Sequence, residues 1–150
     1  MANTKKLTNS IRVNTGAKWI EVNDDGEKIC LNFGDQDFPR RFFQMMEEFD
    51  AYIESIKGRA EELGEREWPN EREQAKARAE LNAEIHVHLR DRIDDVFGTD
   101  TCRKVFGPII PSVDLYAEFL EAITPYFAEY AKEREATLKK KYSATRKGNV

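Results

Sequence analysis

The chain has 150 residues, a formal net charge of −4 and a mean hydropathy of −0.71, with 40% hydrophobic and 35% charged residues. This length suits one domain with a hydrophobic core, and the composition is neither that of a disordered chain nor that of a membrane protein. No segment approaches the roughly 18 apolar residues of a spanning helix, and the polar N-terminus predicts no secretory signal peptide. The two cysteines form no disulfide framework, so we expect a cytoplasmic protein with reduced thiols.

The N-terminal part predicts a small β element after a flexible segment of residues 1–10. Two β-prone runs, Lys18–Val22 and Lys28–Asn32, flank a turn sequence that ends in Gly26. We expect these runs to form a β-hairpin, with Ile11–Val13 as a candidate third strand. Because a two-stranded hairpin is marginal alone, it is expected to pack on the helices that follow.

A long helix is predicted next, beginning at Asp37 or Phe38 with Pro39 in its first turn. Gly64 is expected to end this helix just after Leu63. Its apolar residues recur at alternating steps of four and three positions, which is typical of a helix with one buried seam. The predicted seam consists of Phe42, Met46, Phe49, Ile53, Ile56, Ala60 and Leu63.

A second long helix is predicted over residues 71–96, with Asn70 as its N-terminal cap and Gly98 as its end. The segment is rich in alanine, glutamate, arginine and glutamine, which are good helix formers. The predicted buried stripe consists of Leu81, Ile85, Leu89, Ile93, Val96 and Phe97.

The remaining sequence predicts a short helix capped by Thr99 and a last helix from Ser112, which Pro125 is expected to kink or restart. The fold class is therefore mainly α (α+β), with an N-terminal β-hairpin (11–33) packed on an elongated helical bundle with long antiparallel helices. We expect a single domain over residues 11–142 and a flexible basic tail at 143–150. The inner face of the last helix is predicted to carry Leu115, Phe119, Leu120, Ile123, Phe127, Tyr130 and Ala131.

Positive charge is concentrated near the C-terminus. From Ala131 onward there are seven basic and two acidic residues, a net charge of +5, which leaves −9 for the first 130 residues. The simplest interpretation is a solvated helix end whose lysines interact favourably with the helix dipole, and a contact for an acidic partner is the alternative. Nucleic-acid binding is not expected, because a basic face across the body is missing.

The polar residues predict neither catalysis nor a bound metal or cofactor. His86 and His88 point about 200° apart on a helix, so they cannot hold one metal ion, and surface ion pairs are expected for them. Cys102 lies beside two basic residues, which can lower a thiol pKa, but no histidine base is nearby in sequence. Cys30 is expected to be a buried small residue. We therefore predict a protein that is not an enzyme.

Aromatic residues are more numerous than one helical seam can bury. Core packing is the simplest interpretation for most of them, and an exposed strip for a protein partner is the alternative. The candidate partner-binding residues are the aromatic Phe43, Tyr52, Tyr126 and Tyr130 and the basic Lys139, Lys140 and Lys141.

The chain as a whole resembles the tail assembly chaperones of phages and prophages from Gram-positive hosts. The resemblance is carried by the opening IEVNDDGEKICLNFGDQDFPRRFF, by KVFG at Lys104–Gly107, and by PYFAEYAKERE ahead of a basic end. None of these motifs is catalytic. The resemblance implies a helical, non-enzymatic protein that self-associates and binds the tape-measure protein before the tail tube polymerises.

We therefore expect a non-enzymatic phage protein that binds a tape-measure or other tail protein through helix-in-groove contacts. A homo-oligomer is expected through the Phe42–Leu63 seam or the Leu81–Phe97 stripe, and no membrane partner is expected. Two alternatives stay open, a DNA-associated phage regulator that uses the basic tail and another small structural virion protein.

Overall fold

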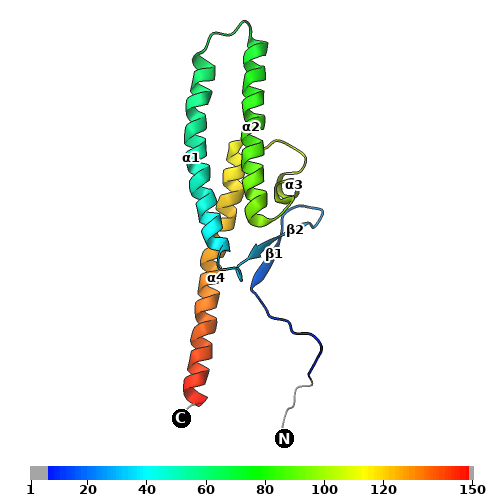
Figure 1. Ribbon diagram of the computed structural model, residues 1–150, viewed down its shortest axis with the longest axis vertical. Helices are drawn as coiled ribbons and strands as arrows, with labels where there is room; N and C mark the ends of the chain where they lie inside the picture. Colours follow the sequence, from blue (N-terminus) through cyan, green and yellow to red (C-terminus); the bar gives the residue numbers. More distant parts are fainter. Residues whose placement is uncertain (1–6, 149–150) are drawn as a thin grey trace.

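The computed structural model describes residues 7–148, and their side chains as far as Ser143. Two strands, β1 (Ala17–Glu21) and β2 (Lys28–Asn32), precede four helices (Figure 1). The helices are α1 (Phe38–Glu65), α2 (Glu71–Phe97), α3 (Thr101–Phe106) and α4 (Val113–Gly148). This architecture confirms the predicted mainly α fold with an N-terminal hairpin. The candidate third strand was wrong, because residues 11–13 form no strand.

The molecule is elongated, and the hairpin, α3 and the N-terminal half of α4 gather near its middle (Figure 1). On one side of the core, α1 and α2 run antiparallel and project as a two-helix arm that ends in the loop of residues 66–70. On the other side, the C-terminal half of α4 extends alone in the opposite direction, and the segment before β1 leaves the body at the same end. The hairpin and α3 lie beside the base of the arm.

The β-hairpin presents one face to the core. β1 and β2 pair antiparallel from Ala17↔Asn32 to Glu21↔Lys28. Alternation places Ile29 and Leu31 in the core, while Cys30 faces the other way beside its cross-strand neighbour Trp19. Cys30 is consequently half-buried, and its predicted full burial was wrong.

Helix α1 packs on the core through its N-terminal half. Phe42 and Ile56 of the predicted seam are buried, but the buried methionine is Met45, while Met46 is only partly covered. Ala60, also predicted in the seam, is exposed, because the distal half of α1 has only α2 beside it.

Helix α2 follows its predicted pattern closely. The Asn70 side chain caps it by accepting a hydrogen bond from the Glu73 amide at 2.9 Å, and all six residues of the predicted stripe are buried. The helix ends at Gly98, whose φ of 119° is a backbone conformation that favours glycine.

The short helix α3 begins at Thr101, later than predicted. Its N-cap is Asp100 and not Thr99, and Asp100 takes the left-handed conformation with φ 65°.

The buried face of α4 also differs from the predicted one, since Tyr116 is fully buried while Leu115 is 39% exposed. The helix is continuous through Pro125 and reaches Gly148, so it does not restart at the proline, one of the two predicted alternatives.

A histidine–tyrosine contact joins α2 to α4. His86 Nδ1 is hydrogen-bonded to the hydroxyl of the buried Tyr116, and burial lowers the pKa of His86, with Arg90 lowering it further and Asp91 and Asp94 opposing. The predicted surface ion pairs of the two histidines were wrong. The His88 ring instead stacks on Tyr52 of α1, with centroids 3.9 Å apart.

The lowered pKa of His86 predicts a loss of stability in mild acid. The folded state favours neutral His86, so its contribution to stability is fully present above the pKa of about 6.5 that histidine has in the unfolded chain. As the pH falls below this value, the unfolded chain binds a proton that the folded chain does not, and this contribution is lost. Urea unfolding between pH 5 and 8 measures this loss. His86→Gln, which cannot take up that proton, is expected to flatten the profile between the same limits, and an unchanged slope would contradict the assignment.

Candidate protein-interaction surface

An aromatic cluster fills the junction of the hairpin, α1, α2 and α4. The Phe127 ring of α4 lies 4.5 Å from that of Phe42, 5.2 Å from Phe33 and 5.5 Å from Phe38, measured between centroids. Phe97 of α2 closes the cluster, 5.9 Å from Phe42. These offset and edge-on contacts hold the four elements together through interlocked side chains.

Three of the predicted partner-binding residues surround this cluster. Phe43 is 48% exposed and lies 5.4 Å from the Phe127 ring, while Tyr130 stacks on Phe33 at 4.6 Å with an interplanar angle of 11°. Tyr126 lies under the Lys18 ammonium, which is 5.1 Å from its ring centroid. We call Phe43, Tyr126, Phe127 and Tyr130 the junction patch.

The other predicted site residues lie elsewhere. Tyr52 is half-buried in the arm against His88, and burial raises the pKa of its hydroxyl, with Glu84 adding to the shift. Lys139, Lys140 and Lys141 lie on the projecting end of α4, where Lys139 forms an ion pair with Glu135 at 3.1 Å. The structure therefore divides the predicted interaction surface among the arm, the junction and the α4 end.

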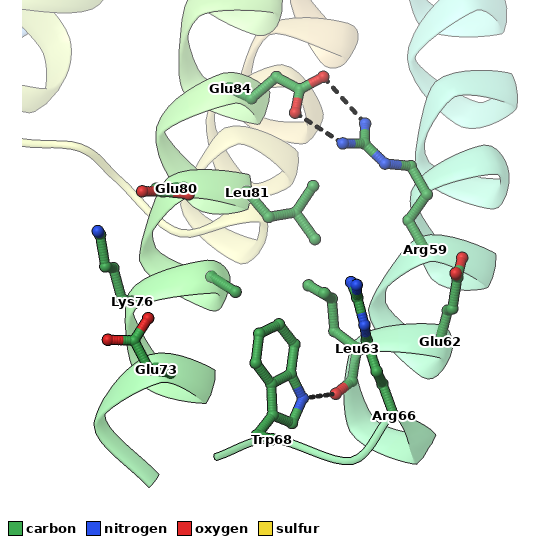
Figure 2. Close-up of a pocket in the computed structure, with 11 residues that line it drawn as sticks. Arg59, Glu62, Leu63, Arg66, Trp68, Glu73, Lys76, Glu80, Leu81 and Glu84 are labelled. Carbon is green, nitrogen blue, oxygen red and sulfur yellow. Dashed lines mark hydrogen bonds and ion pairs between the residues drawn. The ribbon is translucent and has the colours of Figure 1, made fainter. Parts of the chain in front are cut away.

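A groove between α1 and α2 near the tip of the arm was not predicted from the sequence (Figure 2). Its volume is about 470 Å³, and its apolar lining comes from Leu63, Trp68, Ala77 and Leu81. The Trp68 indole donates a hydrogen bond to the Leu63 carbonyl at 2.8 Å, which fixes the ring in the groove. We call this feature the arm groove. Its only signal in the sequence is a tryptophan in the connector between two polar helices.

Charged side chains surround the apolar part of the arm groove. Arg59 donates two hydrogen bonds to Glu84, at 2.9 and 2.8 Å, and so links α1 to α2 (Figure 2). The Arg66 guanidinium lies 5.2 Å from the Trp68 ring centroid. Glu62, Glu73, Glu80 and Lys76 also line the groove, and within the described part of the chain none of these four forms an ion pair.

The surroundings of Cys102 raise the pKa of its thiol, whereas its basic neighbours in the sequence suggested that the pKa could be lowered. Burial in the core, together with Asp94, raises the pKa of the thiol to about 12. The neighbouring arginine is engaged elsewhere, since Arg103 pairs with Glu27 of the hairpin turn at 2.9 Å. Cys102 is thus a core residue without an activated thiolate.

The two thiols are expected to differ in reactivity. A thiol-specific reagent such as DTNB should modify the half-buried Cys30 in the native protein, and Cys102 only after denaturation. Cys30→Ser should therefore remove the native signal, with Cys102→Ser as the matched control that keeps it. Modification of both thiols at comparable rates in the folded protein would contradict this.

Over residues 7–148, no cluster of three or more histidine, cysteine, aspartate or glutamate side chains could hold a metal ion. Within the same range no helix has the length and apolar character needed to cross a membrane.

These features define a mainly helical protein with a small β-hairpin, an arm of two antiparallel helices and a projecting basic helix. Residues 25–149 match the model of a family of unknown function, DUF6673. Because the match covers most of the chain, the protein belongs to this family. Neither the curated proteins nor the solved structures contain a match to the chain.

Proposed function

We propose that this protein acts in phage tail assembly as a non-enzymatic protein that self-associates and binds a helical tail protein, with the tape-measure protein as the partner. The proposal rests on the resemblance to tail assembly chaperones described above. The observation that supports it is the junction patch, where aromatic side chains remain partly exposed over an interlocked cluster. Large aromatic residues on a rigid base are typical anchors of protein interfaces.

We infer that the homo-oligomer uses other surfaces than the two predicted from periodicity. Most of the Phe42–Leu63 seam and the whole Leu81–Phe97 stripe pack within one chain. Self-association through them would need the core to open, so the exposed parts of the arm and of α4 are the better candidates.

The tail partner is tested by affinity capture from host cells in which the prophage that encodes the protein has been induced. Recovery of the tape-measure protein with the tagged chain is the expected result. Phe43→Ser should reduce this recovery about tenfold or more, as truncation of an interface anchor does. Val87→Ser is the matched control, because Val87 has a similar exposure on α2 outside the junction patch.

Capture of the tagged chain without any tail protein would contradict the proposal. The DNA-associated regulator would be favoured instead if the tagged chain retained nucleic acid. That binding should then weaken steeply with salt and be lost when residues 139–150 are removed. Equal recovery by Phe43→Ser and the wild type would show that the partner binds outside the junction patch.

A further inference from the structure

The projecting end of α4 carries two apolar side chains beyond the core, the half-buried Leu138 and the exposed Tyr142. Tyr130 is the last α4 residue that packs on the core. Leu138 and Tyr142 follow Phe127 by 11 and 15 positions, and at about 100° per residue they lie within roughly 60° of its line along the helix. Two apolar residues therefore lie near the core-facing line beyond the core, and Tyr142 is 66% exposed.

The positive charge of this helix end favours an acidic binding partner. From Ala131 onward the net charge is +5, so two such ends would repel each other if they were paired side by side. An acidic surface with an apolar centre would complement it. Beyond Tyr130 no described residue of α4 belongs to the core, and a helix end with little tertiary support is only marginally stable, so docking would stabilise it.

The arm groove has this complementary character. Its floor is apolar, and two of its three basic residues are already engaged, Arg59 with Glu84 and Arg66 over the Trp68 ring. Arg59 is neutralised by Glu84, whereas Arg66 keeps its charge over the ring. Glu62, Glu73 and Glu80 therefore exceed Arg66 and Lys76 by one negative charge. It also lies at the opposite end of the molecule from the end of α4 (Figure 1).

We propose that the end of α4 from one copy docks in the arm groove of the next copy. Leu138 and Tyr142 contact the floor around Trp68 and Leu81, and the lysines of α4 face the glutamates of the groove. Because the two surfaces differ and lie at opposite ends, the contact is heterologous and repeats into a ring or an open chain. This proposal rests on the self-association in the proposed function and not on its tail partner.

The test is sedimentation velocity of the full-length chain over a range of protein and salt concentrations. The wild type should form species larger than a dimer as its concentration rises, and salt should dissociate them. A groove variant, E62K/E80K, and a helix variant, K139E/K140E, should each weaken association at least about tenfold on their own. Circular dichroism confirms that each variant keeps its helices.

An equimolar mixture of the two charge variants supplies the decisive measurement. The acidic helix end of one variant then meets the basic groove of the other, and the original pair of surfaces also remains available, so association should return. The control variant R12E/K28E makes the same change in net charge as K139E/K140E, at exposed positions outside both surfaces, and should associate like the wild type. L138S/Y142S should weaken association without any change in charge.

Two outcomes of the sedimentation experiments overturn the proposal. A wild type that remains monomeric throughout shows that the end of α4 has another partner. Normal association of the groove variant shows that the arm groove does not bind the end of α4. This is the result expected if two α4 helices contact each other instead. Absence of the tape-measure protein in the capture experiment, with self-association intact, removes the proposed function but leaves this contact standing.

Discussion

Phe42→Ala is expected to lower the free energy of unfolding by about 3–5 kcal/mol. The Phe42 side chain is fully buried where α1, α2 and α4 meet, with its ring 4.5 Å from Phe127 and 5.9 Å from Phe97. Alanine leaves a cavity that the surrounding rings cannot fill, because each is held by contacts to the others. Urea denaturation followed by circular dichroism measures the loss.

The next residue provides the control. Phe43 contacts the same cluster but is 48% exposed, so Phe43→Ala is expected to cost about 1–2 kcal/mol, in proportion to the smaller area it buries. Equal losses at the two positions would mean that the helix is rotated about its axis relative to this structure.

Gly34→Ala is expected to destabilise the protein by about 1–3 kcal/mol or more, as overpacking does. A Cβ atom at residue 34 would lie 1.8 Å from the Thr15 carbonyl oxygen and 2.7 Å from its carbonyl carbon. The obstacle is backbone, so either the chain at Thr15 or the turn after β2 must move. Movement of the chain at Thr15 would also displace Gly16, which packs closely on the Tyr130 ring. A Cβ atom on Gly16 would lie 3.4 Å from Cε2 of Tyr130.

Gly58→Ala is the opposite case and serves as the comparison. Gly58 lies within α1, and no atom comes within 4 Å of the position its Cβ would take. The substitution should therefore raise the free energy of unfolding by about 1 kcal/mol through helix propensity alone. Thermal melts of the two variants should shift in opposite directions, and a stabilised Gly34→Ala would contradict the packing described for Thr15.

The elements of this protein were predictable because their signals are local. The turn that ends in Gly26, the cap at Asn70 and the glycine at position 98 act within a few residues of themselves. The stripe of α2 was predicted completely, since a helix packed along one side repeats its burial at the helical period. In α1 the same reasoning failed at Ala60, because periodicity shows which face is apolar but not how far along the helix a neighbour reaches.

The candidate surfaces were only partly predictable. Phe43, Tyr126 and Tyr130 were found by counting aromatic residues, but their gathering around Phe127 depends on how α1, α4 and the hairpin meet. The arm groove has no local pattern, since it forms between two helices from residues as far apart as Arg59 and Glu84.

The sequence by itself determined the order of the elements, their approximate lengths and the separation of an acidic body from a basic end, because each depends on neighbouring residues or on composition. Only the tertiary structure decided that Cys102 is a buried core thiol with a raised pKa, that His86 bonds to Tyr116, and that Gly34 makes room for Thr15. Each of these properties depends on a group distant in sequence, whose burial, charge or backbone position sets the local chemistry.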